Sequence, residues 1–239
     1  MNIVKLSVTA AVIAGLAACA GTSNKPLTAE GLFARHVEVA YGGKGMGVHP
    51  SAISTGTLFI ESFGIEAPIT TKTLEPGNFV FETNVMGMAM SQGCNASGCW
   101  SQQPGAGITP LSGEQLDFFR QQADGRQFEH IGDYYDTLEL VASDNPDAKD
   151  YKVRAVNKYG RENFYYFAKD TGLLSGTDIT MDSEMGVMTQ HTTLTNYQNF
   201  DGVLMAKETL QSSSMADVKV VLDNVSFVPL TEKDFMRPE

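Results

Sequence analysis

Short stretches of alternating apolar and polar residues run along most of the chain after residue 54. Alternation at every second position is typical of a β-strand that buries one face. Tight connections rich in glycine and proline, such as Phe63-Gly64-Ile65 and Pro76-Gly77, separate the first stretches. Strands are therefore predicted at residues 55–62, 68–74, 79–90, 137–142, 151–157, 163–169, 173–181, 187–197, 203–211 and 218–228.

Two segments instead carry apolar residues at the spacing of a helix. The first begins after Thr28, a residue type that caps helix N-termini, and ends at Gly42-Gly43. The second covers residues 112–122, where Ser112 and Gln115 have capping-box spacing. The apolar faces are Leu32, Phe33, His36, Val37 and Ala40 in the first helix, and Leu116 and Phe119 with Leu111 in the second.

Consecutive strands with short links predict an antiparallel meander. With only two helices for so many strands, the sheet has to bury its own apolar face. We therefore predict an α+β fold, in which a strongly curved antiparallel sheet has an apolar concave face that the helices cover.

The N-terminus has a different pattern. Residues 1–5 carry one positive charge, residues 6–18 are apolar or small almost throughout, and Leu16-Ala17-Ala18-Cys19 ends the segment. The apolar part is shorter than the ~20 residues that span a bilayer, so it indicates a secretory signal. Leu16-Ala17-Ala18-Cys19 resembles the lipobox of bacterial lipoproteins, whose cysteine receives diacylglycerol and becomes the first mature residue. An ordinary signal peptide with an incidental cysteine is the alternative.

The lipobox resemblance implies three parts: a signal peptide at residues 1–18, a lipidated tether at 19–27, and one domain at 28–239. In lipoproteins of this kind an aspartate after the cysteine retains the protein in the inner membrane. Ala20 stands there instead, which implies lipid anchoring in the outer membrane. We expect the domain to face the periplasm.

Charge narrows the range of partners. Loss of Lys5 with the signal leaves 16 basic against 28 acidic side chains, a net charge of −12. Nucleic acid needs a basic surface, so it is excluded as a partner. Adhesion to anionic lipid by charge alone is excluded as well, which leaves membrane attachment to the lipid anchor.

The chain has three cysteines. Lipidation of Cys19 leaves Cys94 and Cys99, which an oxidising periplasm allows to pair. Four residues with turn chemistry, Asn95-Ala96-Ser97-Gly98, lie between them, so we predict a disulfide across the neck of a hairpin. Redox-active motifs have two intervening residues, so a catalytic role for this pair is not expected.

Three turn motifs follow in a fixed order: Asp170-Thr171-Gly172-Leu173-Leu174, Asn199-Phe200-Asp201-Gly202-Val203, and Leu230-Thr231-Glu232-Lys233-Asp234-Phe235 with Pro238. Upstream, one strand ends in Gly93-Cys94 and the next begins at Trp100. This order resembles the LolA/LolB-like superfamily of periplasmic lipoprotein carriers, and more closely the lipoprotein-like domains associated with insulinase-type zinc peptidases. The resemblance covers most of residues 28–238. It implies an unclosed half-barrel with an apolar cavity suited to acyl chains.

On this reading, apolar residues of the third strand and the second helix, together with the tryptophan between them, are candidates for ligand binding. They are Phe79, Phe81, Met86, Met88, Met90, Trp100, Leu116 and Phe119. Leu58 or Phe59, together with Leu140, are expected on the same concave face. The alternation of Met86, Met88 and Met90 also permits a second interpretation, because thioethers on one strand face can bind Cu(I). Flexible methionines that fill a core or an acyl cavity are the simpler explanation.

No catalytic pattern appears. The four histidines, His36, His49, His130 and His191, lack metal-ligand spacing, and a Gly-x-Ser-x-Gly serine motif is absent. Asp170-Thr171-Gly172 matches the tripeptide of aspartic proteases. It occurs once, however, whereas that chemistry needs two carboxylates that share a proton, so we interpret it as a turn. A non-enzymatic protein without metal or cofactor is expected.

Three functions remain open. The leading hypothesis is an outer-membrane-anchored periplasmic lipoprotein that binds a lipid or another apolar ligand in a half-barrel cavity. The second is an interaction or peptidase-accessory module that docks an envelope protein and has no ligand. The third is a Cu(I)-binding periplasmic protein that uses the three methionines.

Replacement of the lipobox cysteine tests the anchor. Cys19→Ala should abolish labelling with radioactive palmitate and release the protein from the membrane fraction, because no other segment of the sequence is expected to hold it there. Fractionation identical to that of the unmutated protein would contradict the assignment.

Overall fold

The computed structural model describes residues 27–42, 49–103, 105, 107–143, 145, 147–183, 186–214 and 216–238. Cys19, and with it the signal and most of the tether, lies outside these residues. The strands are β1 Ser51–Ile60, β2 Ile65–Leu74, β3 Asn78–Val85, β4 Met88–Asn95, β5 Gly98–Gln103, β6 Gly107–Pro110, β7 Thr137–Val141, β8 Asp150–Val156, β9 Glu162–Ala168, β10 Leu174–Ser183, β11 Gly186–Phe200, β12 Val203–Ser212 and β13 Asp217–Ser226. The helices are α1 Ala29–Tyr41 and α2 Gly113–Ala123, with 3-10 turns η2 Glu61–Phe63, η3 Gln127–Glu129, η4 Ile131–Asp133 and η5 Glu232–Phe235.

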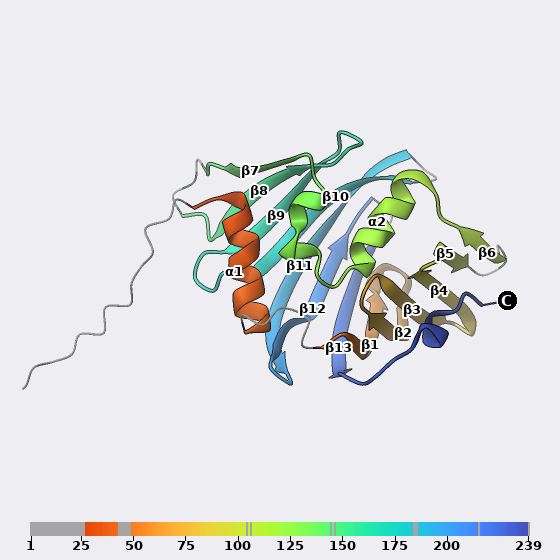
Figure 1. Cartoon of the computed structure of the whole chain (residues 1–239). Helices are drawn as coiled ribbons and strands as arrows, with labels where there is room; N and C mark the ends of the chain where they lie inside the picture. The colour runs from red at the N-terminus through yellow and green to blue at the C-terminus, as the bar shows by residue number, and fades with distance from the viewer. Residues whose placement is uncertain are drawn as a thin grey trace, which may run out of the picture.

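All thirteen described strands form one antiparallel sheet in the order β6-β5-β4-β3-β2-β1-β13-β12-β11-β10-β9-β8-β7. The first and last strands pair at the centre, and the meander extends outward from them in both directions. The sheet is strongly curved and unclosed, with both α-helices on one side of it (Figure 1). The predicted α+β half-barrel, with helices over its concave face, is confirmed.

The central pairing of β1 with β13 contains a bulge between Thr55 and Gly56. A Cβ atom at Gly56 would lie 2.4 Å from the carbonyl oxygen of Val221. Only glycine therefore allows the two backbones to approach so closely at this point.

Helix α1 fills one half of the concave face. Thr28 caps it as predicted, since its Oγ1 accepts a hydrogen bond from Gly31 N at 3.0 Å. Phe33 is 1 % exposed and packs edge-on against Tyr165 and Phe167 of β9, with ring centroids 5.0 Å apart in both pairs. Burial of such aromatic side chains stabilises this half of the fold.

The strand predicted at residues 79–90 is wrong as a single strand. It is a hairpin, because β3 ends at Val85 and β4 begins at Met88. Met86 (φ 53°) and Gly87 (φ 84°) form the turn, which breaks the alternation that the sequence seemed to continue. A second difference concerns α2, because Ser112 occupies its N-cap position without a side-chain capping bond.

His36 of α1 is buried, and its Nδ1 accepts a hydrogen bond from Leu174 N at 3.1 Å. Burial lowers the pKa of His36 to about 4. An unfolded histidine titrates near 6.5, so the unfolded chain takes up this proton first as the pH falls. Stability that depends on neutral His36 is therefore present above pH 6.5 and is lost between about 6.5 and 4.

We expect the free energy of unfolding to fall by about 2 to 3 kcal/mol more between pH 7 and pH 4.5 in the unmutated protein than in His36→Asn. Asparagine can still accept the bond from Leu174 N but does not titrate. Urea denaturation at both pH values measures the difference. Parallel pH profiles of the two proteins would show that His36 does not contribute.

Candidate functional site

A cavity of about 460 Å³ lies between α2 and the concave face of the sheet. Its volume is within the range of small-molecule sites, roughly 300–1,000 Å³. Strands β3, β4 and β9 to β12 form the floor, and α2 with the segment that follows it forms the roof. The lining residues are Phe79, Gln92, Phe118, Phe119, Gln122, Gln127, Phe128, Tyr165, Leu174, Thr177, Ile179, Gln190, Thr192, Leu194, Thr209 and Gln211.

Helix α2 is held over this cavity from both flanks. On one flank Leu116, Phe119 and Ala123 pack against the pair Cys94 and Cys99. On the other flank Glu114 receives a two-pronged ion pair from Arg161, with Nε 3.1 Å from Oε1. The roof therefore bridges the two halves of the half-barrel, from β4 and β5 to the β8–β9 connection.

Asp117 adds a second polar contact to the same flank. Its carboxylate lies 2.7 Å from Lys158 Nζ and accepts a hydrogen bond from the Tyr159 hydroxyl. These two donors hold the pKa of Asp117 below its usual range. The contacts are exposed, so each contributes little to stability, and they serve to position the helix.

The end of α2 is fastened to the sheet as well. Glu75, in the β2–β3 connection, accepts a hydrogen bond from Gly125 N at 2.6 Å. Partial burial raises the pKa of Glu75, against the opposing effect of this hydrogen bond.

A buried polar network underlies the roof. Gln121 Nε2 donates to the hydroxyls of Tyr135 and Tyr165 at 3.3 and 3.4 Å, and these hydroxyls lie 2.6 Å apart. Asn163 Nδ2 also donates to Tyr135, at 3.2 Å. Burial raises the pKa of Tyr165 well above its usual value, so the network stays uncharged. It fixes the height of α2 above the floor, because buried polar groups need their partners.

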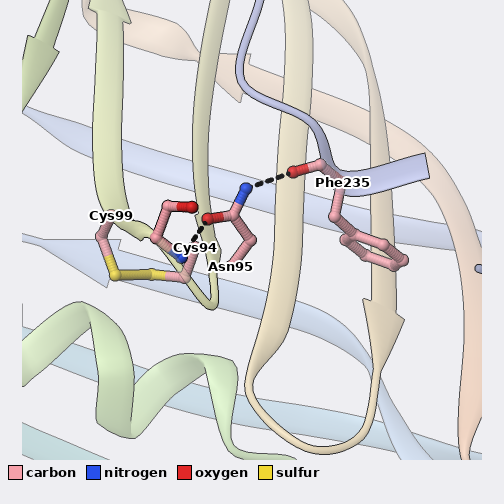
Figure 2. Close-up of a disulfide and its surroundings, with 5 residues drawn as sticks. Cys94, Asn95, Cys99 and Phe235 are labelled. Atoms are coloured by element: carbon pink, nitrogen blue, oxygen red, sulfur yellow. Dashed lines mark hydrogen bonds between the residues drawn. A yellow bond between two sulfur atoms is a disulfide. The ribbon is translucent and has the colours of Figure 1, made fainter. Parts of the chain in front are cut away.

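The hairpin beside α2 contains the predicted disulfide. Cys94 and Cys99 are directly paired across β4 and β5, with Cα atoms 4.0 Å apart and an S–S bond between them. Asn95 at the turn accepts from Ser97 N and donates its Nδ2–H to the carbonyl oxygen of Phe235 at 3.0 Å (Figure 2). The hairpin thus connects α2 on the concave face to the C-terminal segment on the other face.

Several predicted candidates share the concave face. Phe79 and Phe119 line the cavity, and Leu116 packs beside it on the disulfide. Phe81 follows Phe79 by two residues on β3, and Met90 and Met88 extend the same face of β4 towards the turn. The register also places Leu58, rather than Phe59, on this face, since Leu58 pairs with Ala67 and Phe79 pairs with Thr73.

Two candidates lie elsewhere. Trp100 packs on the opposite face with Val80 and Phe235, where a Cβ on Gly93 would be 2.4 Å from its ring. Met86 is 84 % exposed at the β3–β4 turn. The three methionines therefore do not form one strand stripe, because only Met88 and Met90 share a strand.

Trp100 and Leu116 both line a second, wider hollow at the end of the β4–β5 hairpin. This hollow has a volume of about 560 Å³ and lies beside the disulfide, with Arg120 and Arg237 at its margin. The indole Nε1 of Trp100 has no hydrogen-bond partner among the described residues.

The sequence did not predict the neutral polar half of the cavity lining. Gln190, Thr192, Thr209 and Gln211 occupy alternate positions of β11 and β12, a pattern that sequence alone assigns to a solvent-facing side. Only the curvature of the sheet and the roof reveal that these positions face the cavity. Phe118 was missed because it lies beside the predicted apolar stripe of α2, and Phe128 because it lies in η3, outside the predicted helix.

The turn interpretation of Asp170-Thr171-Gly172 agrees with the structure, where this segment links β9 to β10 and Gly172 N donates to Ala168 O at 2.7 Å.

Across the described ranges, no group of three or more His, Cys, Asp or Glu side chains could hold a metal ion. No helix in the described part of the chain is long and apolar enough to cross a membrane.

Solved structures share this architecture. A LolA superfamily protein from Nitrosomonas europaea superposes with a TM-score of 0.57 at 13% identity, covering 89% of this chain and 99% of that one. The fold is LolA-like. A DUF1329 family protein from Desulfovibrio piger gives a TM-score of 0.57 at 14% identity, covering 87% of this chain and 95% of that one.

A third LolA-like neighbour, from Vibrio parahaemolyticus, is a domain named for outer membrane lipoprotein sorting. It has a TM-score of 0.54 at 14% identity, and 80% of this chain and 90% of that one are covered. No protein-family model and no curated protein matches the sequence. The closer resemblance to peptidase-associated domains stays a prediction.

Removal of the disulfide should destabilise the hairpin that supports α2. We expect the double variant Cys94→Ala/Cys99→Ala to lose about 2 kcal/mol of unfolding free energy, as the chain-entropy model gives for so short a loop. Urea denaturation with and without reductant provides the measurement. Reductant should destabilise the unmutated protein and leave the double variant unchanged, and equal sensitivity of both would contradict the bond.

Proposed function

We propose that this protein is a non-enzymatic, lipid-anchored envelope protein that binds a lipid or similar apolar ligand between α2 and the concave face of its LolA-like sheet. The observation that carries the proposal is the 460 Å³ cavity, into which Phe79, Phe118 and Phe119 project. Each buried methylene of a ligand contributes roughly 0.8 kcal/mol, so a long acyl chain gains enough to bind.

The anchor belongs to the same proposal. The lipobox resemblance at Leu16-Ala17-Ala18-Cys19 supports lipidation of Cys19, and Ala20 supports the outer membrane. A domain tethered in this way would meet lipids at the periplasmic surface. The name of the Vibrio parahaemolyticus neighbour is in keeping with such a role.

The cavity supports ligand binding over the alternative function, an interaction module without a ligand. Under α1 the concave face is filled by the protein itself, since Phe33, Val153, Phe167 and their neighbours form a continuous core. A module without a ligand would be filled in this way along the whole sheet. The half of the concave face under α2 is not filled in this way, because the cavity lies there.

Two substitutions on one strand test the cavity. Thr192 lines it, whereas Thr193 is exposed on the opposite face of β11. Thr192→Trp should fill the cavity and reduce binding of the uncharged fluorescent probe Nile red by about tenfold or more, and Thr193→Trp should leave it unchanged. Both variants place tryptophan in a strand, where it is well tolerated.

Fluorescence titration is carried out on the delipidated chain from residue 20 onwards, which keeps every residue of the described fold. Far-ultraviolet circular dichroism confirms that both variants remain folded. Absence of saturable binding to the unmutated chain, or equal loss in both variants, would refute the proposed site.

A further inference from the structure

The floor of the cavity carries a compact group of neutral polar side chains. Thr177 of β10 pairs with Thr192 of β11, and Thr192 pairs with Gln211 of β12. These three residues therefore form a continuous row across three strands. Gln190 and Thr209 flank the row on β11 and β12, and both line the same cavity.

These side chains find no hydrogen-bond partner in the part of the protein that the structure describes. Within the described residues, Thr177, Thr192, Thr209, Gln190 and Gln211 make no side-chain hydrogen bond to protein. Amides and hydroxyls that face a cavity take their hydrogen-bond partners from water or from a ligand. The row is thus a set of donors and acceptors at the base of a cavity whose lining also includes phenylalanine, leucine and isoleucine side chains.

Part of the surrounding wall is apolar. Phe118 and Phe119 lie above the floor, while Ile179 and Leu194 flank the polar row on β10 and β11. A ligand that satisfies both surfaces has an acyl chain for the wall and a hydrogen-bonding group for the row. An ester carbonyl suits the amide and hydroxyl donors, and a ligand hydroxyl suits the amide oxygens.

The uncharged lining of the cavity favours neutral head groups over anionic ones. Among the described residues, none that lines the cavity is a Lys, Arg, His, Asp or Glu. Lys207 precedes Thr209 by two residues on β12 but does not line the cavity. An anionic phosphate or carboxylate would lose its hydration there without gaining a cation. The net charge of the chain without its signal, −12, adds further repulsion.

We infer that the cavity selects uncharged amphiphiles, in which an acyl chain is ester-linked to a hydroxyl-bearing head group, and discriminates against the corresponding phosphate-bearing lipids. The Thr177–Thr192–Gln211 row binds the head group, and the phenylalanines of α2 cover the chain. The inference rests on the proposed lipid-binding function and specifies which lipids the same site accepts.

A matched pair of lipids tests it. Monooleoylglycerol and 1-oleoyl lysophosphatidic acid differ only by one phosphate. Each displaces Nile red from the delipidated chain from residue 20 onwards, at pH 7.5 and below the aggregation concentration of the lipid. We expect monooleoylglycerol to bind about tenfold tighter or more, since one uncompensated buried charge costs at least that much.

Substitutions in the row then test whether its side chains cause the preference for the neutral lipid. Gln211→Leu should weaken the binding of monooleoylglycerol by roughly 3- to 10-fold more than the binding of Nile red, which is the value of one hydrogen bond. Gln211→Lys should raise the affinity for the phosphate lipid about tenfold. Gln198→Lys is the control, because it adds the same charge at an exposed position of β11 that does not line the cavity.

The outcomes are distinguishable. If Nile red binds and the phosphate lipid binds as tightly as monooleoylglycerol, the selectivity is overturned while lipid binding stands. An equal effect of Gln211→Lys and Gln198→Lys also overturns it, because the overall charge would then be responsible. If neither lipid nor Nile red binds, both the selectivity and the proposed function are overturned.

Discussion

The placement of α2 follows from the order of the strands. β6 and β7 are consecutive in the chain, yet they are the two opposite edges of the sheet. The segment that joins them must cross from one edge to the other, and it crosses over the concave face, where its apolar side chains find a surface. The roof of the cavity is thus the connection that an unclosed barrel requires. The Cys94–Cys99 hairpin on one flank and Arg161 on the other fix the ends of this crossing.

The two halves of the concave face differ in how they are completed. Under α1 the protein supplies its own aromatic side chains, and His36 is buried there in its neutral form. Under α2 the roof rests on a polar network through Gln121, Tyr135 and Tyr165, which holds the helix away from the floor. A network of this kind maintains space, whereas interlocking apolar side chains would fill it. The unfilled volume is therefore part of how this half is built.

Local patterns in the sequence predict most elements of the fold, including the Thr28 cap, the apolar face of α1 and the strands from β7 onwards. The turn at Met86-Gly87 was missed because methionine is not a typical residue at a positive φ. The pairing of β1 with β13 depends on contacts between distant parts of the chain, which alternation cannot specify. Phe79, Leu116 and Phe119 were recognisable as apolar residues of one layer. The role of Gln190 and Gln211 depends on curvature, which has no local signal.

The central pairing of the first and last strands has a kinetic consequence. Residues Ile53 and Ser226 are neighbours in the sheet but lie far apart along the chain. Contacts of such long range slow folding, since the entropy of closing the loop is lost before the contact forms. The two flanking meanders can form from local hairpins, but they cannot join until the end of the chain is present. A chain that is synthesised N-terminus first would therefore expose the open edges of β1 and β12 until β13 arrives between them.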